Sequence, residues 1–130
     1  MAISVLVIDD NRDNVEIVRH GLEARGYLVS VAYNGDEGLA LFDSERPTIV
    51  LLDVMMPGRN GWEVCRVMKQ HPEHGKSVRV IMLTALGGWD DKQTALQTGA
   101  DDFMTKPIDL AELAERVKRN AALVTPVSPS

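Results

Sequence analysis

The alternation of short apolar runs with longer segments of helical period constrains the fold of this chain most strongly. The runs that we predict to be strands lie at 5–8, 28–31, 49–52 and 80–83, with a short one at 103–104. Three of them consist mainly of Val, Ile and Leu without polar alternation, which is typical of strands buried on both faces. The pattern predicts five βα units, and so an α/β fold in which a doubly wound parallel sheet has helices on both faces.

The segments between these runs each carry one apolar stripe at helical spacing. The stripes are Val15, Val18 and Leu22; Leu39 and Phe42; Val64, Cys65 and Met68; and Leu110, Leu113, Val117 and Ala121. Asp109 is placed to cap the last helix, and Gly26 and Gly99 fall where helices should end, because glycine tolerates the left-handed conformation. We therefore expect one folded domain over 1–124 and a linker-like or disordered tail at 125–130.

Length, charge and cysteine count exclude several classes of protein. A chain of 130 residues suits a single domain. The net charge of -5 argues against direct contact with nucleic acid, whose partners concentrate Lys and Arg on one face. The single Cys65 excludes an internal disulfide and is expected to be a core thiol. Since no apolar run approaches the ~20 residues of a membrane span, we predict a soluble, cytoplasmic protein with no membrane partner.

Polar side chains follow the predicted strands at the points where those strands end. Asp9 and Asp10 follow the first strand, Asp53 the third and Thr84 the fourth, and Lys106 comes shortly after the fifth. In a doubly wound sheet, ligands bind beyond the carboxyl ends of the strands. We therefore expect these side chains to converge on one edge of the sheet.

Three carboxylates in one place require a cation. Two unit charges about 4 Å apart interact by roughly 4 kcal/mol at an effective dielectric constant near 20. Oxygen ligands without nearby His or Cys suit Mg²⁺. Lys106 adds a positive charge, and the Thr84 hydroxyl can donate a hydrogen bond to a phosphate oxygen. The set is suited to phosphoryl transfer.

Each of these residues also has an ordinary structural interpretation. Asp9 with Asn11 can simply form a turn, Thr84 can be a β-branched strand residue, and Lys106 can be a surface charge. Their joint placement at successive strand ends favours a functional site.

Four stretches, VLVIDDN, LLDVMMPGRNG, VIMLTA and GADDFMTKP, resemble in order and spacing the signature segments of the receiver domains of two-component response regulators. The resemblance covers residues 4 to about 123. It implies a (βα)5, flavodoxin-like sheet of strand order 2-1-3-4-5, like that of chemotaxis regulators. It also implies that Asp53 is the phosphoacceptor, Asp10 a direct Mg²⁺ ligand, Asp9 a ligand acting through water and the Met55 backbone carbonyl a third metal contact.

The resemblance assigns the remaining site residues as well. Thr84 becomes the switch hydroxyl, Phe103 the switch aromatic and Lys106 the phosphate-pairing lysine, and the Lys106–Pro107 peptide bond is expected to be cis. The positions that modulate the reaction rate in this family are Met55 and Leu86, neither of which can orient an attacking water. Because Phe103 lacks a hydroxyl group, its burial should rest on packing alone.

The function implied is a signalling domain that catalyses only its own phosphorylation and dephosphorylation. A histidine kinase, a phosphotransfer protein or a small phosphodonor would supply the phosphoryl group. The fourth helix, fifth strand and last helix would then present a changed surface to an unknown output domain or protein, or in a phosphorylation-dependent dimer. An aspartate-based phosphatase would need an acid at Met55. A receiver-like interaction module that works without phosphorylation is disfavoured because every acceptor-site residue is present.

The other conspicuous side chains carry less information. His71 and His74 lie in a polar stretch, HPEHGK, and we predict solvated residues there rather than a metal site, since no third ligand is near in sequence. Trp62 and Trp89 are expected to be packing residues beside the loops of the site.

Overall fold

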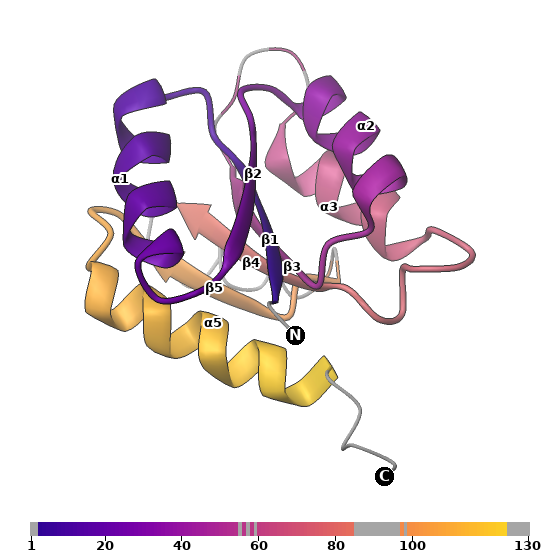
Figure 1. Ribbon diagram of the computed structural model, residues 1–130. Helices are drawn as coiled ribbons and strands as arrows, with labels where there is room; N and C mark the ends of the chain where they lie inside the picture. The colour runs from indigo at the N-terminus through magenta and orange to yellow at the C-terminus, as the bar shows by residue number, and fades with distance from the viewer. Residues whose placement is uncertain are drawn as a thin grey trace, which may run out of the picture.

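A five-stranded parallel sheet forms the centre of the computed structural model, which describes residues 3–54, 56, 58, 60–84, 97 and 99–124 (Figure 1). The strands are β1 (Ser4–Ile8), β2 (Leu28–Ala32), β3 (Ile49–Asp53), β4 (Arg79–Thr84) and β5 (Asp102–Thr105). Their order is β2-β1-β3-β4-β5, and all four neighbouring pairs are parallel. The predicted fold class and strand order are confirmed.

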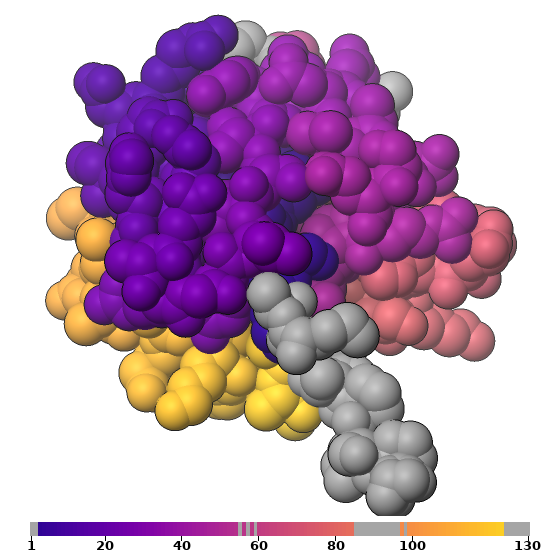
Figure 2. Space-filling model, in the orientation of Figure 1, coloured from indigo at the N-terminus to yellow at the C-terminus, as the bar shows by residue number. Residues whose placement is uncertain are grey.

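Helices cover both faces of this sheet. Their bounds are α1 (Arg12–Glu23), α2 (Gly35–Glu45), α3 (Gly61–Lys69) and α5 (Leu110–Val124). The helices α1 and α5 lie on one face and α2 and α3 on the other (Figure 1). In the space-filling view the same segments form the outer surface, with α1 and α5 on one side and α2 with the segment after α3 on the other (Figure 2). The helix expected between β4 and β5 falls mostly on residues outside the described ranges.

The two faces of the sheet produce two hydrophobic clusters. Successive strand residues point to opposite faces, so Ile8 and Leu52 pack with α2 and α3, whereas Val7 and Leu51 pack with α1 and α5. Every residue of β3 is buried. The predicted helical stripes face these clusters: all of their members are buried except Leu39 and Leu110, which are partly buried.

Short polar residues start the helices at the carboxyl ends of the strands. The N-caps of α1, α2 and α3 are Asn11, Asn34 and Asn60, and each side chain accepts a hydrogen bond from the backbone N–H three residues later. The Asp109 carboxylate accepts from the N–H groups of the residues two and three positions later, at 2.8 and 3.2 Å, as a cap of α5. Helix starts are thus fixed at the edge where the polar residues gather.

The two histidines of the segment after α3 correct one prediction. His71 and His74 are partly buried packing residues rather than freely solvated ones: both rings contact Phe42, with centroid separations of 5.6 and 5.4 Å. His71 Nδ1 accepts from the backbone N–H groups of Glu73 and His74, and His74 Nε2 donates to the Pro47 carbonyl at 2.6 Å. The sequence did not predict this packing, because the partners of the two histidines lie in and after α2, about 27 positions away.

Several predictions concern residues outside the described ranges. These are the tail at 125–130, the roles of Met55 and Leu86, and the packing of Trp89. Trp62 packs against the cluster under α2 and α3, and Cys65 is fully buried within it, as expected. Among the described residues, no helix combines the length and the apolarity that crossing a bilayer requires.

Candidate functional site

Three carboxylates meet at the carboxyl edge of the sheet. Asp9, Asp10 and Asp53 each place one carboxylate oxygen so that the three atoms lie within 4.8 Å of one another. Asp9 and Asp53 are 3% exposed, whereas Asp10 faces solvent. The cluster therefore has a buried floor and one carboxylate at its open side.

Backbone pairing fixes the two buried members of the cluster. The Asp9 N–H donates to the Ala32 carbonyl at 3.1 Å, which extends the pairing of β1 with β2 by one residue. Asp53 is the last residue of β3 and pairs with Leu83 of β4. Pairing within the sheet thus fixes the backbone of both residues.

The junction between β3 and α3 leaves no room for a side chain at Gly61. A Cβ atom there would lie 2.4 Å from the Asp53 carbonyl oxygen and 2.7 Å from the Val54 Cα atom. The Gly61 N–H donates to the Val54 carbonyl at 2.9 Å. The first turn of α3 is therefore held directly against the backbone that carries Asp53.

Lys106 supplies the positive charge of the site. Its Nζ atom lies 3.1 Å from Asp53 Oδ1 and 3.4 Å from Asp9 Oδ2. Burial lowers the pKa of Lys106, but the nearby charges of Asp53 and Asp9 and their hydrogen bonds raise the pKa above its ordinary value on balance. The Lys106 N–H donates to the Thr84 carbonyl at 2.7 Å, and the peptide bond from Lys106 to Pro107 is cis.

The Asp9 carboxylate both forms a local turn and faces the lysine of the site. Its Oδ1 atom accepts a hydrogen bond from the Asn11 N–H at 3.0 Å, as in a turn, while Oδ2 faces Lys106. A local turn thus orients one oxygen and leaves the other for the site.

Among the described residues, the cluster carries more negative than positive charge. Lys106 pairs with Asp9 and Asp53, and Asp10 adds a third carboxylate, so a metal cation would lower their repulsion. The candidate ligand atoms among the described residues are carboxylate oxygens, which fit a hard cation such as Mg²⁺ better than a soft one. The residues present could therefore hold a metal ion.

The two expected switch residues lie on the strands beside the acids. Thr84 ends β4, is 1% exposed and pairs with Thr105 of β5. Phe103 lies on β5 opposite Met82 and packs, half-buried, against the cluster under α2 and α3. The structure therefore brings Asp9, Asp10, Asp53 and Lys106 together and sets Thr84 at a neighbouring strand end.

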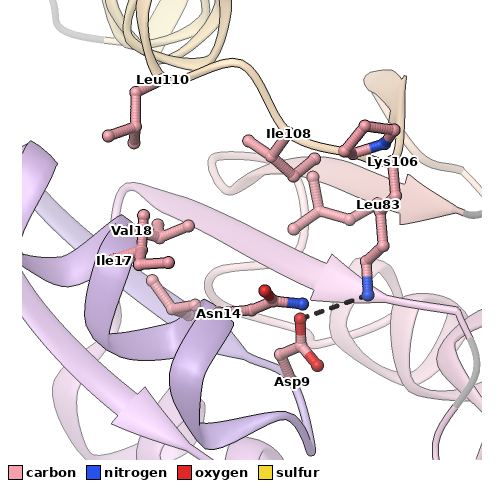
Figure 3. A pocket seen from close by; sticks show the side chains of 10 residues that line it. Asp9, Asn14, Ile17, Val18, Leu83, Lys106, Ile108 and Leu110 are labelled. Carbon is pink, nitrogen blue, oxygen red and sulfur yellow. Dashed lines mark hydrogen bonds and ion pairs between the residues drawn. The ribbon is translucent and has the colours of Figure 1, made fainter.

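Sequence reasoning missed a cavity that adjoins the acids. It is lined by Asp9 and Lys106 together with Asn14 of α1 and a set of apolar side chains (Figure 3). Asn14 follows the cap of α1 by three residues, a position that carries no sequence signal for ligand contact. Only the packing of α1 beside the segment that leads into α5 brings it to the site.

Comparison with known proteins places this geometry in a family. Residues 5–118 match the response regulator receiver domain. A signal receiver domain of a histidine kinase from Syntrophus aciditrophicus is 34% identical, with a TM-score of 0.88 over 99% of this chain and 97% of that one. A proposed response regulator from Chloroflexus aurantiacus is 33% identical (TM-score 0.88, 94% and 99% covered), and the chemotaxis protein CheY4 of Vibrio cholerae is 28% identical (TM-score 0.87, 92% and 98% covered). The chain thus belongs to the response regulator receiver domain family of two-component signalling.

Proposed function

We propose that this chain is a Mg²⁺-dependent phosphoacceptor in which Asp53 receives a phosphoryl group. The observation that carries the proposal is the pairing of a buried strand-end carboxylate, Asp53, with the Lys106 ammonium group 3.1 Å away. The lysine can hold phosphoryl oxygens beside the attacking carboxylate, and the neighbouring acids Asp9 and Asp10 suit a cation that offsets charge. Donors would be a histidine kinase, a phosphotransfer protein or a small phosphodonor.

In the proposed step, an Asp53 carboxylate oxygen forms a bond to phosphorus while the bond from phosphorus to the donor's leaving atom breaks. The electron pair of the broken bond leaves with the donor, as acetate in the case of acetyl phosphate. Asp9, Asp10, Asp53 and the Met55 carbonyl would hold Mg²⁺, which when bound neutralises charge on the phosphoryl oxygens. Lys106 orients the same oxygens through charge-assisted hydrogen bonds.

The response to phosphorylation would use Thr84 and Phe103. A phosphoryl group on Asp53 brings about -1.5 to -2 charge and new acceptor oxygens. The Thr84 hydroxyl would turn toward them, and the Phe103 ring would fill the space left behind. The surface made by the helix before β5, β5 itself and α5 would then differ between the two states, and an output domain, a partner protein or a second copy of the chain could read it.

Intact mass after incubation with Mg²⁺ and acetyl phosphate tests the acceptor. Wild type should gain one phosphate-sized adduct that hydroxylamine removes. Asp53→Asn should gain none, whereas Asp43→Asn, which changes an exposed carboxylate of α2, should behave as wild type. If wild type stays unmodified, the alternative is a receiver-like interaction module that works without phosphorylation. If Asp53→Asn still gains the adduct, the acceptor is a different residue.

A further inference from the structure

A cavity of about 550 Å³ opens beside the acceptor site, between α1 and the segment that enters α5 (Figure 3). Its two ends differ in character. Asp9, Lys106 and Asn14 gather at one end, and Val18 and Leu110 lie toward the other. The other lining residues are all apolar: Val7, Ile17, Leu83, Pro107 and Ile108. Its size and composition suit a small amphipathic molecule with one polar end.

Lys106 connects this cavity to the acceptor. The lysine lines the cavity, and its Nζ atom lies 3.1 Å from Asp53 Oδ1. A phosphoryl group held by Lys106 at Asp53 therefore lies next to the polar end of the cavity. The leaving group of the donor, which is bonded to the same phosphorus, would then lie close to the apolar part of the cavity.

The far wall of the cavity depends on a close contact between two helices. A Cβ atom at position 21 would lie 2.9 Å from Leu110 Cδ2, so Gly21 gives the Leu110 side chain room to lie across α1. On the near rim, the Ile17 side chain is 56% exposed. An aliphatic group entering the cavity would cover part of Ile17 and contact Leu110.

We propose, resting on the proposed function, that this cavity receives the leaving group of a small phosphodonor, so that the chain prefers acyl phosphates with three or four carbons to acetyl phosphate. A bond forms between Asp53 and phosphorus, and the bond from phosphorus to the bridging oxygen breaks. The aliphatic carboxylate leaves with that electron pair. The Asn14 amide donates to the acyl carbonyl oxygen, and the carbon chain packs on Ile17, Val18 and Leu110.

A donor series measures this preference. The kcat/KM for phosphorylation in Mg²⁺ is determined with phosphoramidate, acetyl phosphate, propionyl phosphate and butyryl phosphate. Each added methylene should raise kcat/KM about twofold to fourfold, since the cavity is open on one side and buries the chain incompletely. A series in which propionyl and butyryl phosphate react no faster than acetyl phosphate overturns the inference.

Two matched variants assign the preference to the cavity. Ile17→Ser removes the apolar rim at an exposed position, and the dependence on chain length should weaken to less than twofold per methylene. Val67→Ser changes an apolar side chain of α3 that is 44% exposed and lies outside the cavity, so the full dependence should remain. Equal dependence in both variants contradicts the assignment.

Phosphoramidate separates this inference from the proposed function. It has no carbon chain, so its reaction reports on Asp53 and Lys106 without the cavity. If no donor modifies wild type, phosphoramidate included, the proposed function fails and the inference with it. If phosphoramidate modifies Asp53 and the acyl series is flat, only the preference for longer chains is wrong.

Discussion

The two edges of the sheet differ in how their charged side chains are paired. In the described part of the carboxyl edge, Asp9, Asp10 and Asp53 form a cluster of carboxylates, and Lys106 pairs with Asp9 and Asp53. At the amino edge, where β4 and β5 begin, the ion pairs among the described residues join Asp101 to Lys69 and Arg79, and Asp102 to Arg116, which also pairs with Glu112. Within the described ranges, the carboxyl edge therefore has negative charge that a cation could offset, whereas the carboxylates of the amino edge are paired with cations of the protein.

Asp101 is the centre of the amino edge. Its Oδ2 atom accepts from Lys69 Nζ at 2.9 Å and from the Val80 N–H at 2.8 Å, and its Oδ1 atom lies 3.2 Å from an Arg79 nitrogen. One carboxylate thus joins the end of α3 to the start of β4. At 15% exposure it is largely removed from water, which makes each of these bonds harder to replace.

The buried Asn120 extends the network to β5 and α5. Its side chain accepts from Arg79 Nε at 3.1 Å and donates to Asp102 Oδ2, also at 3.1 Å. Asp102 Oδ1 accepts from Arg116 at 2.6 Å. Since Asp102 directly precedes Phe103, the network anchors the strand that carries the expected switch aromatic. We infer that the amino edge serves as a rigid structural support and that the carboxyl edge is the part that responds to ligands.

The largest effect should come from breaking the amino edge. Asp101→Ala removes the shared acceptor of Lys69, Arg79 and the Val80 N–H, so that two largely buried cations lose the carboxylate that balances their charge. We expect the free energy of unfolding to fall by about 3 kcal/mol, the usual order for losing one partner of a buried ion pair. Urea unfolding followed by far-UV circular dichroism measures it.

The control for that loss is an ion pair on the surface. Glu73→Ala removes the partner of Arg46, and the two side chains are 69% and 40% exposed. Such pairs contribute little, so the unfolding midpoint should stay close to that of wild type. If Asp101→Ala lowers the free energy of unfolding no more than Glu73→Ala does, the amino edge is not a structural support of the fold.

The next largest expected change in stability comes from metal binding at the carboxyl edge. Mg²⁺ should stabilise the protein, because a ligand of the folded state alone at ten times its dissociation constant adds about 1.4 kcal/mol. Thermal unfolding in Mg²⁺ and in EDTA, with ionic strength matched by KCl, measures it. Asp101→Ala should gain as much as wild type, since the altered residue lies at the other edge. A shift that KCl reproduces would contradict a specific metal site.

Removing one carboxylate should change the stability in opposite directions at the two edges, by a smaller amount. In EDTA, Asp53→Asn should be more stable than wild type by roughly 1 kcal/mol, the part of the carboxylate repulsion that Lys106 does not offset. Asp101→Asn should be less stable, because its carboxylate pairs with cations instead of repelling acids. Urea unfolding of both variants provides the test, and a loss of stability in both would show that Asp53 is as well paired as Asp101.

The strands, the cap of the last helix at Asp109 and the acid cluster were predictable because each rests on local pattern or on topology. The burial of residues 49–52 follows from their run of apolar side chains, and the meeting of Asp9 with Asp53 follows from their places at the ends of adjacent strands. The resemblance supplied the order of the strands and the roles of individual residues. Those roles, phosphorylation above all, stay predictions.

What could not be predicted rests on contacts between distant segments. Lys69 meets Asp101 across 32 positions and Arg79 meets Asn120 across 41, and nothing near any of these residues distinguishes them from surface charges. The packing of His71 and His74 on Phe42 and the cavity beside Asn14 have the same origin. Local pattern gives the elements, but side-chain partners depend on how far each helix extends and how it is rotated.

The smallest predicted effect is the dependence of stability on alkaline pH at the carboxyl edge. The pKa of Lys106 is raised because the charges of Asp53 and Asp9 outweigh the effect of burial. A group whose pKa is higher in the folded state stabilises that state fully below the pKa of the unfolded chain, about 10.4 for lysine, and the contribution is lost as the pH rises through the folded value. In metal-free buffer, wild type should therefore lose stability more steeply above about pH 10 than Lys106→Met does. The control is Lys76→Met, which changes an exposed lysine and should follow the wild-type curve. Urea unfolding midpoints between neutral pH and about pH 11 measure the difference. If the curves of Lys106→Met and wild type run parallel, the ammonium group of Lys106 does not stabilise the folded carboxylate cluster.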